Sequence, residues 1–281
     1  MPPYCNVRIS VMIPTYNSAA FVEATLTTVA EQSVLPFEVV VSDDGSSDET
    51  IPRVQAFFCR HPQLRLVVVR NPHRGPGAAR NAGVRAATGD WIAFLDSDDL
   101  WFPGKIARVA EEIRRCANTN LFCHAELHKR LDGSEQVLQH GAGYDPSQPL
   151  PRQLFARNLF STSAVVCRKS VLIECGLFDE ELSSGQDYEL WLRISPSLCV
   201  TLIREPLGCY IDRKGNITSG SIRRRLRNQL RLLHRHRRKT SSVAYYCVLL
   251  RTLANYGRLG VTAFLFHLLH AILRSSQRGE T

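Results

Sequence analysis

The chain has 281 residues, of which 44% are hydrophobic and 22% are charged. These proportions are typical of a globular protein with one large domain or two small ones. They exclude a disulfide-stapled miniprotein, a collagen-like chain and disorder throughout. The formal charge of +9 is unevenly spread, because residues 1–220 hold 22 Lys and Arg against 25 Asp and Glu, whereas residues 221–281 hold 13 against one. The body of the chain is therefore mildly acidic, and its basic character belongs to the tail.

The nine cysteines are scattered along the chain and include no C-x-x-C pair. Their odd number and irregular spacing favour neither a disulfide framework nor a zinc site, and free thiols are typical of a reducing compartment. The apolar run at residues 9–13 is too short to cross a bilayer and leads directly into Pro14. We therefore expect a cytoplasmic protein.

Four short apolar runs are rich in Val, Ile and Phe without polar alternation, which is typical of strands buried on both faces. They cover residues 8–13, 37–41, 64–69 and 91–95, and helical patterns separate them at residues 19–32, 48–59 and 77–87. This alternation predicts a mostly parallel sheet covered by helices. Beyond it the pattern is mixed, with helices expected at residues 105–116, 150–157 and 186–194 and strands at residues 121–128, 164–167 and 199–203.

Polar residues follow directly after three of the predicted strands. Ligands of open α/β sheets bind beyond the carboxyl ends of the strands, so these residues predict one polar cleft. They are Pro14, Thr15 and Tyr16 after the first strand, Asp43 and Asp44 after the second, and Asp96, Asp98 and Asp99 after the fourth.

Asp96 and Asp98 are separated by one residue. Two carboxylates in this arrangement can direct oxygens at one hard cation while leaving positions open for phosphate oxygens. Asp99 adds a third charge, and a cation relieves the repulsion among the three. The alternative is a turn with an Asp cap before a helix.

Asp43, Asp44 and Tyr16 each fit two interpretations. An aspartate at a strand end can accept hydrogen bonds from a nucleobase or a ribose, but Gly45 and the serines after it also form a turn and a helix cap. Tyr16 is either a half-buried aromatic residue or a face on which a base stacks.

The segment GPGAAR at residues 75–80 imitates a dinucleotide-binding fingerprint, because it follows a strand and opens a helix. Arg80 stands where that fingerprint needs a small residue, which disfavours a nicotinamide-binding enzyme. Arg80 is instead a candidate phosphate contact or a solvated helix residue.

Four segments in order closely resemble the family 2 glycosyltransferases of the GT-A fold: VMIPTYN at residues 11–17, EVVVSDDGSSD at 38–48, AARNAG at 78–83 and AFLDSDD at 93–99. A fifth, GQDYELWLR at residues 185–193, is similar to the acidic motif of that family on a helix. The resemblance implies a Rossmann-like α/β fold with a mostly parallel sheet flanked by helices and a C-terminal basic helical extension.

The resemblance also implies a division of the chain. Residues 1–220 form the glycosyltransferase domain, with a nucleotide-sugar half at residues 1–102 and an acceptor half at residues 103–220. The arginine-rich pattern beyond residue 220, rather than the resemblance, predicts a basic amphipathic helical tail at residues 221–281.

The resemblance further implies a metal-dependent inverting transfer of a sugar from a nucleotide diphosphate donor to an acceptor hydroxyl, in polysaccharide or glycolipid biosynthesis. Asp187 is expected to be the general base, although a first-turn aspartate can also simply interact with the helix dipole. Asp98 and Asp96 correspond to the D-x-D motif that holds Mn²⁺ or Mg²⁺, with Asp96 also on the ribose side. The expected donor-binding residues are Pro14, Thr15, Tyr16, Asp43, Asp44, Arg80 and Asp96.

Three positions depart from the family pattern. Gln186 replaces an acidic residue, Ile211 replaces an arginine, and Arg213 replaces a histidine that contacts the metal or the diphosphate. Arg213 can act there only as a direct cation toward phosphate. These departures keep open a non-catalytic nucleotide-sugar-binding protein as the alternative.

In residues 221–239, arginines crowd a helical pattern whose apolar members recur every three or four residues. A second apolar stretch, residues 243–273, is interrupted by polar side chains and does not form an ordinary membrane span. The tail is expected either to dock on an anionic membrane at its inner face or to pack on its own domain as a helical hairpin. Nucleic acid is disfavoured because the body is acidic. The expected partners are therefore a nucleotide-sugar donor and a saccharide or lipid-linked acceptor.

Overall fold

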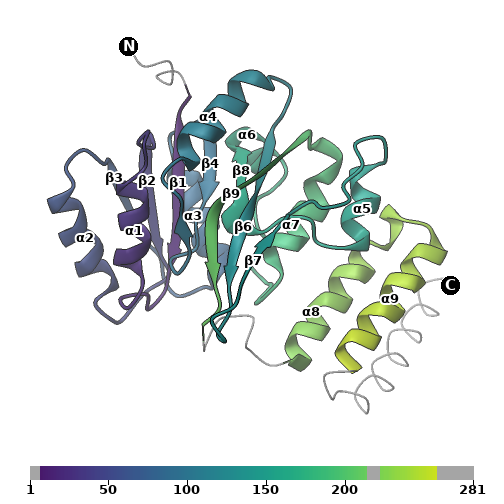
Figure 1. The fold of residues 1–281 in the computed structure, drawn as a ribbon. Helices are drawn as coiled ribbons and strands as arrows, with labels where there is room; N and C mark the ends of the chain where they lie inside the picture. Colours follow the sequence, from purple (N-terminus) through teal and green to yellow (C-terminus); the bar gives the residue numbers. More distant parts are fainter. Residues whose placement is uncertain (1–6, 214–221, 258–281) are drawn as a thin grey trace.

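The computed structural model describes residues 7–213 and 222–257, and Figure 1 shows one sheet with helices on both sides. The strands are β1 (Ile9–Thr15), β2 (Glu38–Asp43), β3 (Leu66–Arg70), β4 (Trp91–Phe94), β5 (Leu100–Trp101), β6 (Leu121–Lys129), β7 (Glu135–Leu138), β8 (Val165–Arg168) and β9 (Val200–Ile211). The α-helices are α1 (Val22–Ala30), α2 (Thr50–Arg60), α3 (Pro76–Ala86), α4 (Lys105–Arg115), α5 (Leu150–Ala156), α6 (Lys169–Glu174), α7 (Gln186–Ile194), α8 (Ile222–Arg235) and α9 (Ser242–Gly257). Short 3₁₀ turns lie at Thr162–Ala164, Ser195–Ser197 and Arg237–Lys239.

The strands pair in the order β3-β2-β1-β4-β8-β6-β9-β5, and β7 adds to β6. The first four strands are mutually parallel. β8 runs antiparallel to β4 and β6, and β6 is parallel to β9. The predicted α/β fold with helices covering a largely parallel sheet is confirmed.

The continuous apolar runs become strands because both faces of the sheet are buried. Successive side chains of a strand point to opposite faces, so Val11 and Ile13 of β1 join one hydrophobic core and Met12 joins the other. Because β1 lies between β2 and β4, the carboxyl ends of all three meet at one edge of the sheet.

Several elements differ from the prediction. β7 is exposed, and α6 is a short helix; neither has a clear apolar period to predict it. β9 continues to Ile211, well beyond the predicted end at residue 203. Its register with β6 shifts between His124 and Glu126 on the facing strand, and this irregularity accommodates Pro206 within a long strand.

The helices α8 and α9 lie side by side next to α5 and α7 (Figure 1). α8 is the predicted basic amphipathic helix, and its Leu232 and Leu233 join the same hydrophobic core as Trp191 of α7. Leu226 and Leu230 pack against α9. Residues 214–221 and the end of the second apolar stretch, residues 258–273, lie outside the described residues. Within the described ranges, no helix is both long and apolar enough to span a bilayer.

Candidate functional site

The first part of the site lies where β1 and β2 end. Thr15 pairs with Asp43 in the sheet register, and its Oγ1 donates a hydrogen bond of 2.9 Å to Asp43 Oδ1. The backbone N–H of Ser46 donates to the other carboxylate oxygen at 2.9 Å. Asp43 is 3% exposed. Thr15 and Asp43, two of the predicted donor-binding residues, thus form one rigid unit. Pro14 immediately precedes Thr15 in the central strand β1.

Asp44 stabilises the loop between β3 and α3 through hydrogen bonds to its backbone. Its carboxylate accepts the backbone N–H groups of Arg74 and Gly75 at 2.9 Å each, and the His73 ring lies 2.9 Å away. Tyr16 is 48% exposed and stacks on His73 with ring centroids 4.2 Å apart. Sequence analysis did not single out His73, which joins Tyr16 in an accessible aromatic pair at the strand ends.

Asp96, after β4, is paired with Arg80 of α3. The Arg80 Nη2 donates to Asp96 Oδ1 at 2.6 Å, and the guanidinium lies 5.7 Å from the Phe178 ring centre. Arg80 is only 7% exposed, and among the described residues its Nε has no hydrogen-bond partner. A buried arginine with an unused donor beside a carboxylate suits an anionic ligand at this point.

The loop that carries Asp98 is fixed to α1. Thr25 Oγ1 donates to the carbonyl oxygens of Ser97 and Asp99 at 2.8 and 2.9 Å. Partial burial raises the pKa of Asp98, the nearby charge of Asp96 raises it further, and Arg213 opposes the shift. Asp96, Asp98 and Arg213 therefore share one electrostatic environment.

The side chain of the buried Ser163 holds the backbone of Asp96 in place. Ser163 Oγ accepts the N–H of Asp96 at 3.1 Å and donates to Asp99 Oδ2 at 2.6 Å, while Lys105 Nζ donates to the Ser163 carbonyl at 2.8 Å. Burial and the charge of Asp96 raise the pKa of Asp99 well above its ordinary value, so Asp99 is a positioning group rather than an exposed carboxylate. Sequence analysis missed Ser163 and Lys105 because no spacing pattern links them to the acidic motif.

Asp187 lies in the first turn of α7, after Gly185, whose φ of 72° is in the left-handed region. Asn158 Nδ2 donates to Asp187 Oδ2 at 3.5 Å. Burial raises the pKa of Asp187, and the charges of Arg80 and Asp96 both act on it, in opposite directions. Asp187 is therefore within electrostatic reach of the residues that follow β4.

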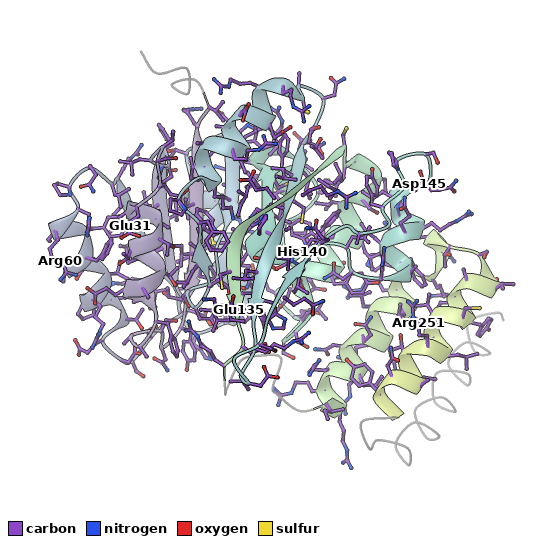
Figure 2. All side chains as sticks on the ribbon, in the orientation of Figure 1. Glu31, Arg60, Glu135, His140, Asp145 and Arg251 are labelled. Atoms are coloured by element: carbon purple, nitrogen blue, oxygen red, sulfur yellow. The ribbon has the colours of Figure 1, made fainter. Side chains whose placement is uncertain are left out.

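A cavity of about 490 Å³ connects α3 and the residue Asp96 after β4 with the first turn of α7. Arg80 and Asp96 form one side and residues 184–188 another. The remaining wall comes from the end of α5 and from α8 and α9, including Arg251, which is labelled in Figure 2. The end of α5 belongs to the predicted acceptor half, whereas no pattern in the sequence predicts that α8 and α9 line the site. By contrast Trp191 is fully buried and packs edge-on against Phe94, so it belongs to the hydrophobic core rather than to the cavity wall.

Asp96, which lines this cavity, and Asp98 are the candidate ligands of a divalent cation. The charge of Asp96 raises the pKa of Asp98, and a cation would relieve this repulsion. Within the described residues, no group of three His, Cys, Asp or Glu side chains is arranged to hold a metal ion. Two carboxylates leave coordination positions open for substrate oxygens, which Mg²⁺ commonly takes as ligands.

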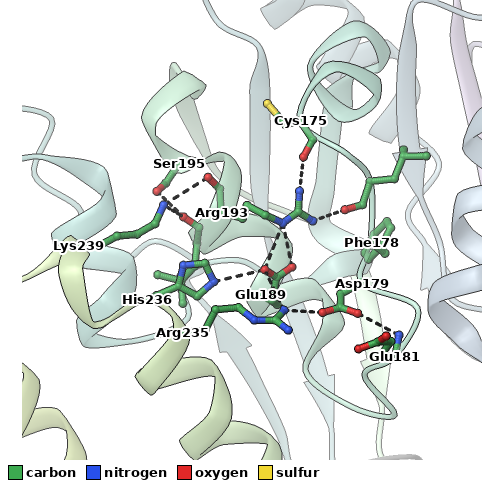
Figure 3. Close-up of polar contacts among 12 residues, drawn as sticks. Cys175, Phe178, Asp179, Glu181, Glu189, Arg193, Ser195, Arg235, His236 and Lys239 are labelled. Carbon is green, nitrogen blue, oxygen red and sulfur yellow. Dashed lines mark hydrogen bonds and ion pairs between the residues drawn. The ribbon is translucent and has the colours of Figure 1, made fainter. Parts of the chain in front are cut away.

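A buried polar network joins α7 to α8 and the turn after it (Figure 3). Glu189 is 1% exposed and accepts hydrogen bonds from Arg193 Nε at 3.1 and 3.2 Å and from His236 Nε2 at 3.3 Å. Lys239 Nζ donates to the carbonyl oxygen of Leu192 at 2.7 Å. The helix that carries Asp187 is thus held in place by side chains of the C-terminal segment.

We expect Glu189→Gln to reduce the free energy of unfolding by about 2 kcal/mol, because the buried carboxylate accepts hydrogen bonds from Arg193 and His236 that an amide replaces only in part. Burial alone would raise the pKa of Glu189, but the hydrogen bonds from His236 and Arg193 outweigh it and lower the pKa below the ordinary 4.5. The carboxylate therefore stabilises the fold above pH 4.5, and this contribution is lost as the pH falls toward the lowered value. Urea unfolding of both proteins across pH 3–7 measures the effect.

The matched control is Glu174→Gln, an exposed carboxylate on α6. It should stay within about 0.5 kcal/mol of the parent chain. Equal stability of the two variants would contradict a stabilising role for the network.

Comparison with known proteins places this geometry in a family. The model of glycosyl transferase family 2 matches residues 10–180, and Asp187 lies outside this matched segment. The amylovoran biosynthesis glycosyltransferase AmsB of Erwinia amylovora is 28% identical over 211 residues, which cover 73% of this chain and 70% of that protein. The chain spans between 26% and 66% of the length of five further curated relatives.

Two solved structures have the same fold. S. aureus TarS 1–349 in complex with UDP-GlcNAc aligns with a TM-score of 0.70 and 22% identity, over 88% of this chain and 72% of that one. The mannosyltransferase PcManGT from Pyrobaculum calidifontis in complex with GDP-Man and Mn²⁺ aligns with a TM-score of 0.63 and 21% identity, over 97% of this chain and 83% of that one. The fold, the strand-end carboxylates and a family match over more than half of the sequence agree: the chain belongs to glycosyl transferase family 2.

Proposed function

We propose that the protein is a metal-dependent inverting glycosyltransferase that moves a sugar from a nucleotide diphosphate donor to an acceptor hydroxyl. The observation that carries this proposal is the shared cavity, which Asp187, Asp96 and Arg80 all line. The cavity brings these three side chains together from separate segments of the chain, which supports their proposed roles as general base, metal ligand and cation toward the diphosphate.

The donor nucleoside would lie at the ends of β1 and β2. Asp43 and Thr15 form a rigid polar unit there, and the exposed Tyr16 offers an aromatic face beside His73. Asp44 holds the adjoining loop through two backbone N–H groups, which keeps the rim of this site in place. The nucleotide sugars bound by TarS and PcManGT support a donor of the same chemical class.

Asp96 and Asp98 would hold Mn²⁺ or Mg²⁺. When bound, such an ion neutralises the negative charge that develops on the departing diphosphate. Arg80 and Arg213 contribute fixed positive charge to the same region. The Nη1 of Arg213 is buried and has no partner among the described residues, which supports the proposal that Arg213 acts as a direct cation toward phosphate.

Asp187 would take the proton from the acceptor hydroxyl as that oxygen attacks the anomeric carbon. In the same step the bond from this carbon to the diphosphate breaks, so the configuration inverts. The raised pKa of Asp187, which follows from its burial, makes the carboxylate a stronger base than an exposed aspartate. Asn158 can orient the carboxylate through Oδ2.

The departure at Gln186 does not favour the non-catalytic alternative. Gln186 is 5% exposed, and its Nε2 donates to the carbonyl oxygen of Leu182 at 2.7 Å. Its role is to fix the entry to α7, and it leaves Asp187 in the cavity.

The acceptor is proposed to be a saccharide or a lipid-linked saccharide in polysaccharide or glycolipid biosynthesis. The name of AmsB, which refers to amylovoran biosynthesis, supports this setting. Exposed arginines on α8, such as Arg224 and Arg227, support peripheral contact with an anionic membrane through residues 221–281.

A panel of UDP, GDP and dTDP sugars tests the proposal directly. We expect one donor, with Mn²⁺ or Mg²⁺, to raise Tm and to be hydrolysed slowly in the absence of an acceptor. A donor at 100 times its Kd stabilises the fold by about 2.7 kcal/mol. If the full chain neither binds nor hydrolyses any nucleotide sugar with either metal, the proposal fails.

A further inference from the structure

Three arginines from three different elements line the cavity on the side away from β4. They are Arg157 after α5, Arg225 of α8 and Arg251 of α9. The carboxylates among the described residues that line the cavity are Asp96 and Asp187, and Asp96 is already paired with Arg80 at 2.6 Å. Positive charge therefore exceeds negative charge on this wall, which favours an anionic ligand.

Two of these side chains are held in place by the backbone. Arg251 Nη2 donates to the carbonyl oxygen of Ala156, and Arg157 Nη2 donates to that of Ala142. A guanidinium has five N–H donors, so one backbone contact orients the group and leaves others for a ligand. Burial raises the pKa of the Tyr188 hydroxyl and the charge of Arg251 opposes this, so Arg251 acts on the residue next to Asp187.

Neutral polar side chains lie between the arginines. Asn158, Asn228, Gln229 and Asn255 all line the cavity. Asn228 Nδ2 donates to Ser184 Oγ at 2.8 Å, which ties α8 to the loop before α7. Amide groups both donate and accept hydrogen bonds, as the hydroxyl groups of a saccharide require.

We propose that the wall formed by α8, α9 and the end of α5 binds the acceptor, and that this acceptor carries an anionic group, a phosphate or a carboxylate, near its reacting hydroxyl. The inference rests on the proposed function. The diphosphate of the donor is assigned to the side of Asp96 and Asp98, whereas a base must face the anomeric carbon from the opposite side. Arg157 and Arg251, on the side of the cavity beyond Asp187, are therefore left to a charge on the acceptor.

Binding of three small saccharides to the full chain tests this inference. With UDP or GDP and Mn²⁺ present, whichever nucleotide binds, calorimetry compares glucose 1-phosphate, methyl β-glucuronide and neutral methyl β-glucoside. We expect at least one charged saccharide to bind about 10-fold more tightly than the neutral one, the gain typical of a hydrogen bond to a charged group. The tighter of the two charged probes distinguishes phosphate from carboxylate.

Arg251→Gln and Arg157→Gln should each weaken binding of the charged saccharide about 10-fold, and Arg251→Lys should weaken it less. The matched control is Arg231→Gln, which removes the same charge from an exposed position of α8 that does not line the cavity. It should bind all probes like the parent chain. Tm values of all variants verify that each is folded, and Arg157→Gln keeps the test decisive if Arg251→Gln unfolds.

Equal binding of charged and neutral saccharides, no binding of either charged one, or an equal loss in Arg231→Gln would overturn the inference. It is also overturned if the cavity variants lose affinity for the nucleoside diphosphate and keep that for the saccharide, because the arginines would then serve the donor. In each case metal-dependent nucleotide-sugar binding by the parent chain still supports the proposed function, so the two failures are distinguishable.

Discussion

Asp187→Asn is expected to lower the turnover number by about 10³-fold, within the range that a positioned general base contributes. The amide keeps the shape of the side chain and its place at the start of α7, but it does not accept the proton of the acceptor hydroxyl. Donor binding should change little, since the nucleoside and diphosphate are assigned to the strand ends. Turnover with the donor found in the panel measures the loss, and calorimetry with the same donor measures binding.

The pH profile gives an independent check on this base. Burial raises the pKa of Asp187 above the ordinary 3.8, so activity of the parent chain should fall with decreasing pH at a higher pH than an exposed aspartate would give. The residual activity of Asp187→Asn should lack this acidic limb. Because burial disfavours the ionised form in the folded state, the amide should not lower Tm at neutral pH.

Glu181→Gln is the matched control, since it also changes a carboxylate to an amide, at an exposed position shortly before α7. It should retain the turnover of the parent chain. Full activity of Asp187→Asn would exclude Asp187 as the base.

Chelation of divalent ions should abolish transfer, and Asp98→Asn should lower turnover by more than about 100-fold. The proposed ligands of the ion are two protein carboxylates and the diphosphate of the donor. Loss of one of the two carboxylates should therefore lower the affinity for the ion strongly. Titration of Mn²⁺ in the presence of the nucleoside diphosphate, followed by electron paramagnetic resonance, measures this affinity apart from catalysis. Restored Mn²⁺ or Mg²⁺ should return activity to the chelated parent chain.

Asp132→Asn is the control for this variant, because Asp132 is an exposed carboxylate in the turn between β6 and β7. Its Mn²⁺ affinity and turnover should match the parent chain. If Asp98→Asn binds Mn²⁺ as tightly as the control and remains active without added metal, Asp98 has no part in holding an ion.

The part of the fold from β1 to β4 is predictable because its signals are local. Continuous apolar runs identify β1, β2 and β4, and parallel strands place their carboxyl ends together. Thr15 and Asp43 therefore meet as expected from their places after two neighbouring strands.

The rest of the site depends on contacts between distant segments, which no period in the sequence encodes. Ser163 supports Asp96 from a 3₁₀ turn, and Arg251 reaches the cavity from α9. From the sequence alone, the arginines of α8 are equally consistent with a solvent-exposed face and with a face that docks on a membrane. Only the packing of Leu232 and Leu233 into the core shows which side of this helix faces the protein.

The two sides of the cavity have separate origins in the chain. Arg80 and Asp96 belong to the N-terminal strands and helices, whereas Arg225 and Arg251 belong to the C-terminal helices. Donor preference and acceptor preference can therefore be altered by substitutions in different segments of the chain. Any replacement of α8 and α9 must nevertheless keep the contacts of His236 and Lys239 with α7, since these hold the helix that carries Asp187.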